Sequence, residues 1–195
     1  MDITATPFTY QPNDVVSVRQ WDAHQTLYKG YVTKVNEISN TLQDTALEKQ
    51  ANATYSVFRG LKTAETFALN GVVLHELYFR NFPEGMQRVP GPRTAQLLSF
   101  AYGSVDAWQK DFEATALSAR GWAICVYDQR TGRCRNIVLD NHHLGYVCGG
   151  FPLVVLDMYE HAYFLDYATD KNTYVARFMA QINWDAVEKR AVLVP

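Results

Sequence analysis

The stretch "VVLDMYEHAYFLDY", residues 154–167, places a carboxylate and an imidazole four positions apart, at Asp157 and His161. The apolar run "FPLVVLD" leads into this pair, and a short continuous apolar run is typical of a buried strand. Aromatic residues surround and follow the pair. A solvated helix face is the simplest explanation of such spacing, but the rest of the sequence argues against it.

The size and composition indicate a compact globular protein. The chain has 195 residues, 48% of them hydrophobic and 13% aromatic, enough for one domain or for two small layers that share an interface. Its formal net charge is −2 without a block of like charges, so nothing indicates nucleic acid or a membrane surface as a partner. No apolar run approaches the roughly 20 residues of a membrane span.

Two further features predict a cytoplasmic location. The segment "MDITATPFTYQPND" has neither the basic nor the apolar region of a secretory signal. The three cysteines, Cys125, Cys134 and Cys148, are an odd number without CxxC spacing. Cys125 and Cys134 could face each other across a hairpin, but we expect free thiols in a reducing compartment.

The first half of the chain reads as helical. Apolar residues at three- and four-residue spacings predict a helix over 14–40, with Asn13 or Asp14 as its N-cap. A second helix is predicted over 44–59 and a third over 66–82.

The second half mixes helices with a small sheet. The Pro- and Gly-rich segment 83–93 is the predicted linker between the halves. Two helices follow, broken at Gly103, with Ser104 as N-cap of the second. "GWAICVYD" and "CRNIVLD" are strand-like runs joined by hairpin chemistry, and terminal helices are predicted at about 160–168 and 171–181. This order predicts an α+β fold, and no nucleotide-binding glycine motif is present.

The chain has only five histidines, and three of them lie on apolar segments. His24 and His75 each fall inside a predicted helix with aromatic residues close by, and His161 follows the predicted buried strand. Any one of them alone would be read as a core histidine. Three histidines and Asp157, all on apolar segments, favour a metal site for Fe, Mn or Zn, and the spacing does not choose among these ions.

Several segments resemble one known family. "LDMYEHAYFLDYATDKNTYVARFMAQINWDAVEKR" resembles the C-terminal signature of the iron/manganese superoxide dismutases, D-x-W-E-H-A-Y followed by N-W-D. "LNGVVLHELYFRNF" is similar to the family's second-ligand helix, and "ARGWAICVYDQRTGR" to its first sheet hairpin. "YKGYVTKVNEI" is similar to the end of its first helix, so the resemblance runs in order over nearly the whole chain.

The resemblance implies a fold, a cofactor and an activity. An N-terminal helical hairpin domain, 1–85, would precede a C-terminal α+β domain with a three-stranded antiparallel sheet, 93–195. One Fe or Mn ion per chain would lie between them, bound by three histidines, one aspartate and a solvent molecule, and would convert superoxide to hydrogen peroxide and dioxygen. Carried over by motif, the metal ligands are His24, His75, Asp157 and His161.

The same resemblance implies roles around the ion. His142 in "LDNHHLG" corresponds to a histidine that bonds the solvent in some members; Asn141 is the competing candidate, and a plain surface loop is the alternative. Tyr31 is similar to the gateway tyrosine of the substrate funnel, unless it is an ordinary core tyrosine. Trp122 is expected to wall the metal pocket or simply to fill the core. Tyr159 replaces the usual tryptophan and is expected to pack beside the metal without binding it.

Glu160 carries the expectation of a homodimer, possibly a tetramer. In the family this glutamate crosses the dimer interface to the partner's equivalent of His161, which orients the ring and raises its basicity. The alternative is a solvent-exposed glutamate. Phe164 and Tyr28 stand where other members form a second bridge across the dimer, so that bridge is expected to be absent or replaced by packing.

The first ligand departs from the family pattern. Most members place it eight residues before the gateway tyrosine, whereas His24 precedes Tyr31 by seven and Ala23 occupies the aligned position. Because a helical turn takes about 3.6 residues, a regular helix is not expected to present both His24 and Tyr31 in the usual geometry, and a local irregularity such as a π-bulge is one alternative. Otherwise Val32 would face the funnel, or His24 would not bind metal. We favour His24 as ligand.

Two rival functions remain from the sequence. One is a non-catalytic relative that keeps the fold as a structural or interaction module. The other is a different non-haem iron oxidoreductase with a two-histidine, one-carboxylate site. The residues do not distinguish Fe from Mn.

Overall fold

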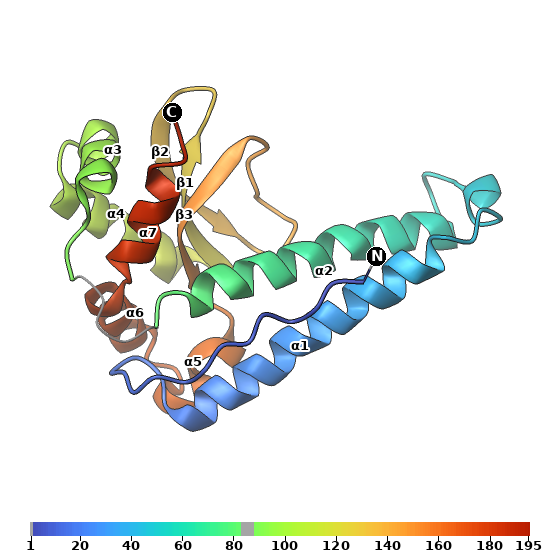
Figure 1. Cartoon of the computed structure of the whole chain (residues 1–195), viewed down its shortest axis with the longest axis horizontal. Coiled ribbons are helices and arrows are strands. Elements are labelled where there is room, and N and C mark those ends of the chain that lie inside the picture. The colour runs from blue at the N-terminus through green and yellow to red at the C-terminus, as the bar shows by residue number, and fades with distance from the viewer. Residues whose placement is uncertain (1, 83–87) are drawn as a thin grey trace.

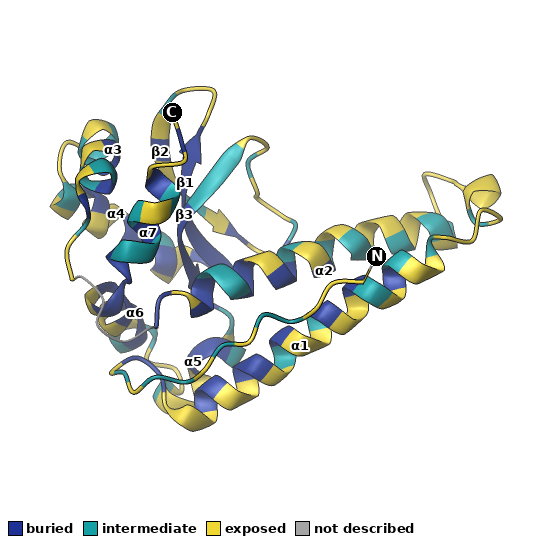
Figure 2. Cartoon of the chain, in the orientation of Figure 1, coloured by how far each residue is buried: buried dark blue, intermediate teal, exposed yellow. Residues whose placement is uncertain are grey.

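The computed structural model describes residues 2–82 and 88–195. A long helical hairpin, α1 (Val18–Thr41) and α2 (Val57–Phe79), extends from a part that contains a three-stranded sheet and the remaining helices (Figure 1). Burial is concentrated where the base of the hairpin meets the sheet, while the far end of the hairpin is largely exposed (Figure 2). The predicted α+β fold is confirmed.

Helix α1 begins later than its sequence predicted. Its N-cap is Ser17, whose Oγ accepts a hydrogen bond from the amide of Gln20. The predicted N-cap Asn13 instead accepts bonds from the amides of Val15 and Val16, both at 2.9 Å, and so forms a turn before the helix. The prediction of Asn13 or Asp14 as the cap was therefore wrong by about one turn.

A single helix, α2, replaces two predicted ones. Ser56 caps it through the amide of Arg59, and the helix runs unbroken to Phe79. The predicted helix over 44–59 was wrong: apart from the short 3₁₀ turn Glu48–Gln50, this stretch is irregular until Val57. Most of its residues are exposed, so a helix there would bury no apolar face. Of the predicted linker, residues 83–87 lie outside the described residues.

The C-terminal part follows its predicted order. Gly103 adopts a left-handed conformation (φ 87°) between two helices, and Ser104 caps the second of them through the amide of Ala107. Residues 184–191, for which the sequence pattern predicts no element, form a last helix capped by Asn183. The elements are α3 (Pro92–Tyr102), α4 (Val105–Ser118), β1 (Trp122–Asp128), β2 (Arg133–Leu139), β3 (Gly150–Asp157), α5 (Glu160–Tyr167), α6 (Lys171–Gln181) and α7 (Trp184–Ala191).

The sheet places two site residues side by side. Its order is β2-β1-β3, both pairings are antiparallel, and every residue of β1 is buried. The register pairs Trp122 at the start of β1 with Asp157 at the end of β3. Helix α2 packs against β3, and α4 packs against β1 and β2. Asp157 is thereby presented to the base of the hairpin.

Within the described part of the chain, no helix is long and apolar enough to cross a membrane.

Candidate metal centre

Four side chains from four elements converge at the junction of hairpin and sheet. His24 comes from α1, His75 from α2, Asp157 from the end of β3 and His161 from the first turn of α5. Asp157 Oδ2 lies 3.1 Å from His24 Nε2, 3.2 Å from His161 Nε2 and 3.6 Å from His75 Nε2. The site residues predicted as ligands are thus brought together. Only His161 keeps appreciable exposure, at 31% of its side chain.

Two hydrogen bonds hold Asp157 in place, one to its side chain and one to its backbone carbonyl. The amide of Tyr159 donates to Asp157 Oδ1 at 2.9 Å, and Tyr174 Oη donates to the Asp157 carbonyl, also at 2.9 Å. Tyr174 Oη in turn lies 3.1 Å from the hydroxyl of Tyr78. Burial alone would raise the pKa of Asp157, but the interactions with His161 and His24 outweigh it and hold the pKa below its usual value.

The Nε2 atom of His75 is the strongest indication of a metal site in the cluster. Its Nδ1 lies 2.5 Å from the carbonyl oxygen of Gly71, which can only accept, so Nδ1 carries the proton. Burial, followed by the nearby charge of His24, lowers the pKa of His75 to about 3, so the ring is neutral. Its Nε2 is therefore a buried lone pair with no hydrogen-bond partner among the described residues.

These residues fit a metal ion. A buried lone pair that faces a carboxylate oxygen is unfavourable unless a cation lies between them. The four ligand atoms all lie within 4.8 Å of one another, and atoms bound to one ion at about 2.1 Å lie within about 4.2 Å, so only small adjustments are needed. Three imidazoles and one carboxylate suit Fe, Mn or Zn.

A second chain of hydrogen bonds borders the cluster. Trp122 Nε1 donates to His142 Nδ1 at 2.8 Å, and His142 Nε2 lies 2.8 Å from the hydroxyl of Tyr31. Burial lowers the pKa of His142 to about 4, so the ring is neutral. Because an indole only donates, Nδ1 of His142 is the acceptor and Nε2 carries the proton. Tyr31 Oη thus accepts from His142, and its own O–H remains available.

Tyr159 and Asn141 occupy the side of the cluster next to His161. The Tyr159 ring stacks on that of His161, with centroids 5.1 Å apart and planes at 15°. Burial, then the charge of Asp157, raises the pKa of Tyr159 to about 12. The Asn141 Oδ1 lies 3.4 Å from the Tyr159 hydroxyl. Asn141 therefore contacts Tyr159, whereas His142 is the residue bonded to Tyr31.

The expectation that a regular helix could not present both His24 and Tyr31 was wrong. The helix is continuous from Val18 to Thr41, yet it presents both His24 and Tyr31 to the site. Seven residues at about 100° each fall only about 20° short of two full turns, so the two side chains share one face. Val32, eight residues after His24, lies in the hydrophobic core. The spacing of seven therefore needs no bulge.

Sequence reasoning missed Gly71. A Cβ at this position would lie 2.9 Å from Tyr31 Cδ1, so the glycine allows the Tyr31 ring to lie directly against α2. Its carbonyl also fixes the proton of His75. A glycine inside a helix costs about 1 kcal/mol relative to alanine, and that conflict was the signal of a close approach.

The residues expected near a subunit interface differ in exposure. Glu160 and Phe164 are exposed on α5. Tyr28 is fully buried, and its hydroxyl donates to Glu76 at 2.7 Å and accepts from the amide of Thr6. Tyr28 is therefore committed within its own chain and does not face outward.

Comparisons with known proteins identify the family of the chain. The family model for iron/manganese superoxide dismutases, C-terminal domain, matches residues 90–190. The chain is 41% identical over 172 residues to a protein of Aquifex aeolicus named superoxide dismutase [Fe], covering 87% of this chain and 79% of the relative. It is 30% identical over 192 residues to superoxide dismutase [Mn] 1 of Halobacterium salinarum, covering 97% and 94%. It is 32% identical over 185 residues to superoxide dismutase [Fe] of Saccharolobus solfataricus, covering 93% and 85%.

Proposed function

The chain belongs to the family of iron/manganese superoxide dismutases, and from this premise we propose how its own residues carry out superoxide dismutation. The reaction turns two superoxide radicals and two protons into dioxygen and hydrogen peroxide. The rival functions, a non-catalytic relative and another type of non-haem iron enzyme, are not favoured. The named relatives are dismutases, and the cluster retains three histidines and one carboxylate.

The metal ligands are the four clustered side chains. His24, His75 and His161 would bind through Nε2 and Asp157 through Oδ2. A bound Fe or Mn ion supplies the one-electron oxidation and reduction that these side chains cannot perform. The observation that carries the assignment is the buried, unpartnered Nε2 of His75.

Tyr31, His142 and Trp122 would manage protons at the edge of the site. Reduction of superoxide to peroxide consumes protons, and the Tyr31 hydroxyl borders the cluster through its hydrogen bond with His142. Because Trp122 holds His142 as the Nε2–H tautomer, Tyr31 Oη accepts from the ring and its proton can point toward the substrate. Tyr159 packs on His161 and excludes water from that side.

We further propose an oligomeric state, a division into domains and a cellular location for the chain. A homodimer is supported by exposed Phe164 and Leu165 beside the half-exposed ligand His161, with Glu160 reaching the partner's ligand histidine; a tetramer would pair such dimers. The hairpin part would form a domain over 1–85 and the sheet-containing part a domain over 93–195. Free cysteines support the cytoplasm, where the activity would serve an antioxidant role.

The test is the variant His24→Ala, measured for metal content and dismutase activity on the same sample. We expect both to fall severely, because loss of one imidazole leaves three protein ligands. His143→Ala is the matched control, since His143 lies outside the cluster and should leave the metal content unchanged. Retention of both metal and activity in His24→Ala would show that the site depends on His75, Asp157 and His161 alone.

A further inference from the structure

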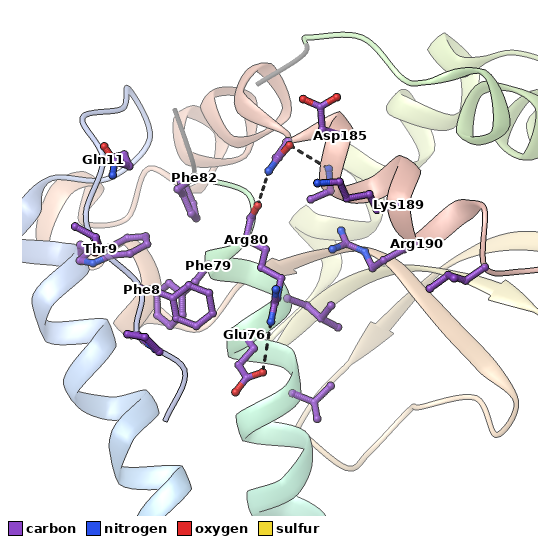
Figure 3. Close-up of a pocket in the computed structure, with 17 residues that line it drawn as sticks. Phe8, Thr9, Gln11, Glu76, Phe79, Arg80, Phe82, Asp185, Lys189 and Arg190 are labelled. Carbon is purple, nitrogen blue, oxygen red and sulfur yellow. Dashed lines mark hydrogen bonds and ion pairs between the residues drawn. The ribbon is translucent and has the colours of Figure 1, made fainter. Parts of the chain in front are cut away.

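A second concave site lies behind the histidine cluster. Residues 7–11, the C-terminal half of α2 and helix α7 enclose a pocket of about 840 Å³ (Figure 3). Sites for small molecules typically measure about 300–1,000 Å³. Phe79 separates the pocket from the cluster, because its ring lines the pocket and its centroid lies 5.0 Å from that of His24.

Cations outnumber carboxylates in the lining. Arg80 projects from the end of α2, and Lys189 and Arg190 project from α7 toward it (Figure 3). The carboxylates are those of Glu76 and Asp185. Within the part of the chain that the structure describes, Arg80 alone of these three cations forms an ion pair, a long one of 4.0 Å to Glu76.

Glu76 is shared between Arg80 and the N-terminal part of the chain. Its Oε1 already accepts hydrogen bonds from the hydroxyls of Tyr28 at 2.7 Å and Thr6 at 3.1 Å. Its Oε2 is the atom nearer Arg80, at 4.0 Å, so this carboxylate offsets only part of the charge of the three cations. Positive charge prevails on the side formed by Arg80 and α7.

Arg190 is held in position by the backbone. Its Nε and Nη2 both donate to the Leu153 carbonyl, at 3.0 and 2.6 Å, while Nη1 takes part in none of the hydrogen bonds of the described residues. Burial, then the charge of Arg80, lowers the pKa of Arg190 to about 10, so it is still charged at neutral pH. Two guanidinium groups that repel each other in a partly buried place are stabilised by an anion between them.

An apolar wall adjoins Arg80. Phe8, Leu77 and Phe79 line it, and the guanidinium of Arg80 lies 5.8 Å from the centroid of the Phe8 ring. An inorganic anion would contact only the cationic side, whereas a ligand with an apolar portion would cover both.

We propose that this pocket binds a small organic anion, whose carboxylate or phosphate group contacts Arg80, Lys189 and Arg190 and whose apolar portion lies on Phe8 and Phe79. The site is independent of the metal ligands and would be an additional binding function of the chain.

The test is calorimetric titration of the metal-loaded protein with four probes. Phenyl phosphate and benzoate carry a ring with a phosphate or a carboxylate, and the stronger of the two identifies the preferred anionic group. Inorganic phosphate lacks the ring, and benzyl alcohol lacks the charge. We expect at least one aryl anion to bind more tightly than both of these partial probes. Equal binding of inorganic phosphate, or no binding of either aryl anion, would overturn the proposal.

Variants locate the binding. Lys189→Gln and Arg80→Gln should each lower the affinity for the aryl anion by about tenfold, because each removes a charge-assisted contact. Lys110→Gln on α4, outside the pocket, is the matched control and should bind as the parent does. Dismutase activity should be unchanged in Lys189→Gln, which shows that the fold is intact. If both pocket variants bind the aryl anion as tightly as the parent does, the anion lies elsewhere, at the metal for example, and the proposed site is refuted.

Discussion

His142 shows how much a single residue position decides. Both ring nitrogens are engaged, one by the donor Trp122 and the other by Tyr31, so the ring has no lone pair left to offer to an ion. This tautomer separates His142 from the ligand histidines. The same residue type can thus bind metal at one position and orient a hydroxyl at another.

We therefore predict that His142→Ala retains the metal but changes the activity and the redox potential. Loss of a residue that positions a site commonly costs about 10–100-fold in activity, and a loss in that range is expected here. Metal content, potential and activity should be measured on one preparation. Tyr31→Phe is the companion variant, since it removes the hydroxyl but leaves the pair of Trp122 and His142. Complete metal loss in His142→Ala would mean that this histidine is itself a ligand.

At the scale of elements, the packing of α1 on α2 determines where Tyr31 and His75 lie in the site. Tyr31 reaches His142 because it crosses α2 at Gly71, where a side chain is missing. The same turn of α2 ends at His75, whose ring is fixed by the Gly71 carbonyl. One helical turn therefore controls both a ligand and the hydroxyl beside it.

Substituting that glycine tests this arrangement. Gly71→Ala should destabilise the protein by about 1–3 kcal/mol, because its Cβ would overlap the Tyr31 ring in a packed region. Gly60→Ala is the matched control in the same helix: its Cβ would meet nothing within 4 Å, so a gain of about 0.5–1 kcal/mol is expected. Denaturant unfolding measures both. Equal effects of the two substitutions would show that Tyr31 does not pack tightly on α2.

At the scale of the whole molecule, α5 links the metal centre to its surroundings. It carries His161, one of the four proposed metal ligands, together with exposed Glu160, Phe164 and Leu165. The Asp166 carboxylate on the same helix binds the Ser17 amide and hydroxyl at the start of α1, both at 2.7 Å. A partner seated on α5 would therefore influence both a ligand and the position of the hairpin.

We predict that Glu160→Ala weakens dimerisation and lowers metal affinity by about 10–100-fold, because the ligand histidine of the partner loses its orienting carboxylate. Sedimentation and metal analysis check the two effects. Glu113→Ala on α4 serves as the control for loss of a carboxylate away from α5. A stable monomer of the parent chain with full metal content and activity would contradict the prediction.

Local chemistry let the sequence alone determine much of this protein. The left-handed break at Gly103, the Ser104 cap, the hairpin and the ligand pair Asp157 and His161 all depend on neighbours within a few residues. Such signals need no tertiary context. They were sufficient for the α+β fold and for the family resemblance.

Only the tertiary structure decided the rest, because it depends on contacts between distant segments. The predicted helix over 44–59 has nothing to pack against before Val57, so residues 44–56 form no α-helix. The proton of His75 is fixed by its bond to Gly71, but the cluster that its Nε2 faces comes from three other elements. Tyr31 and His142 stand 111 residues apart, and no local pattern could pair them. The helix packing that makes them meet is a property of the folded chain.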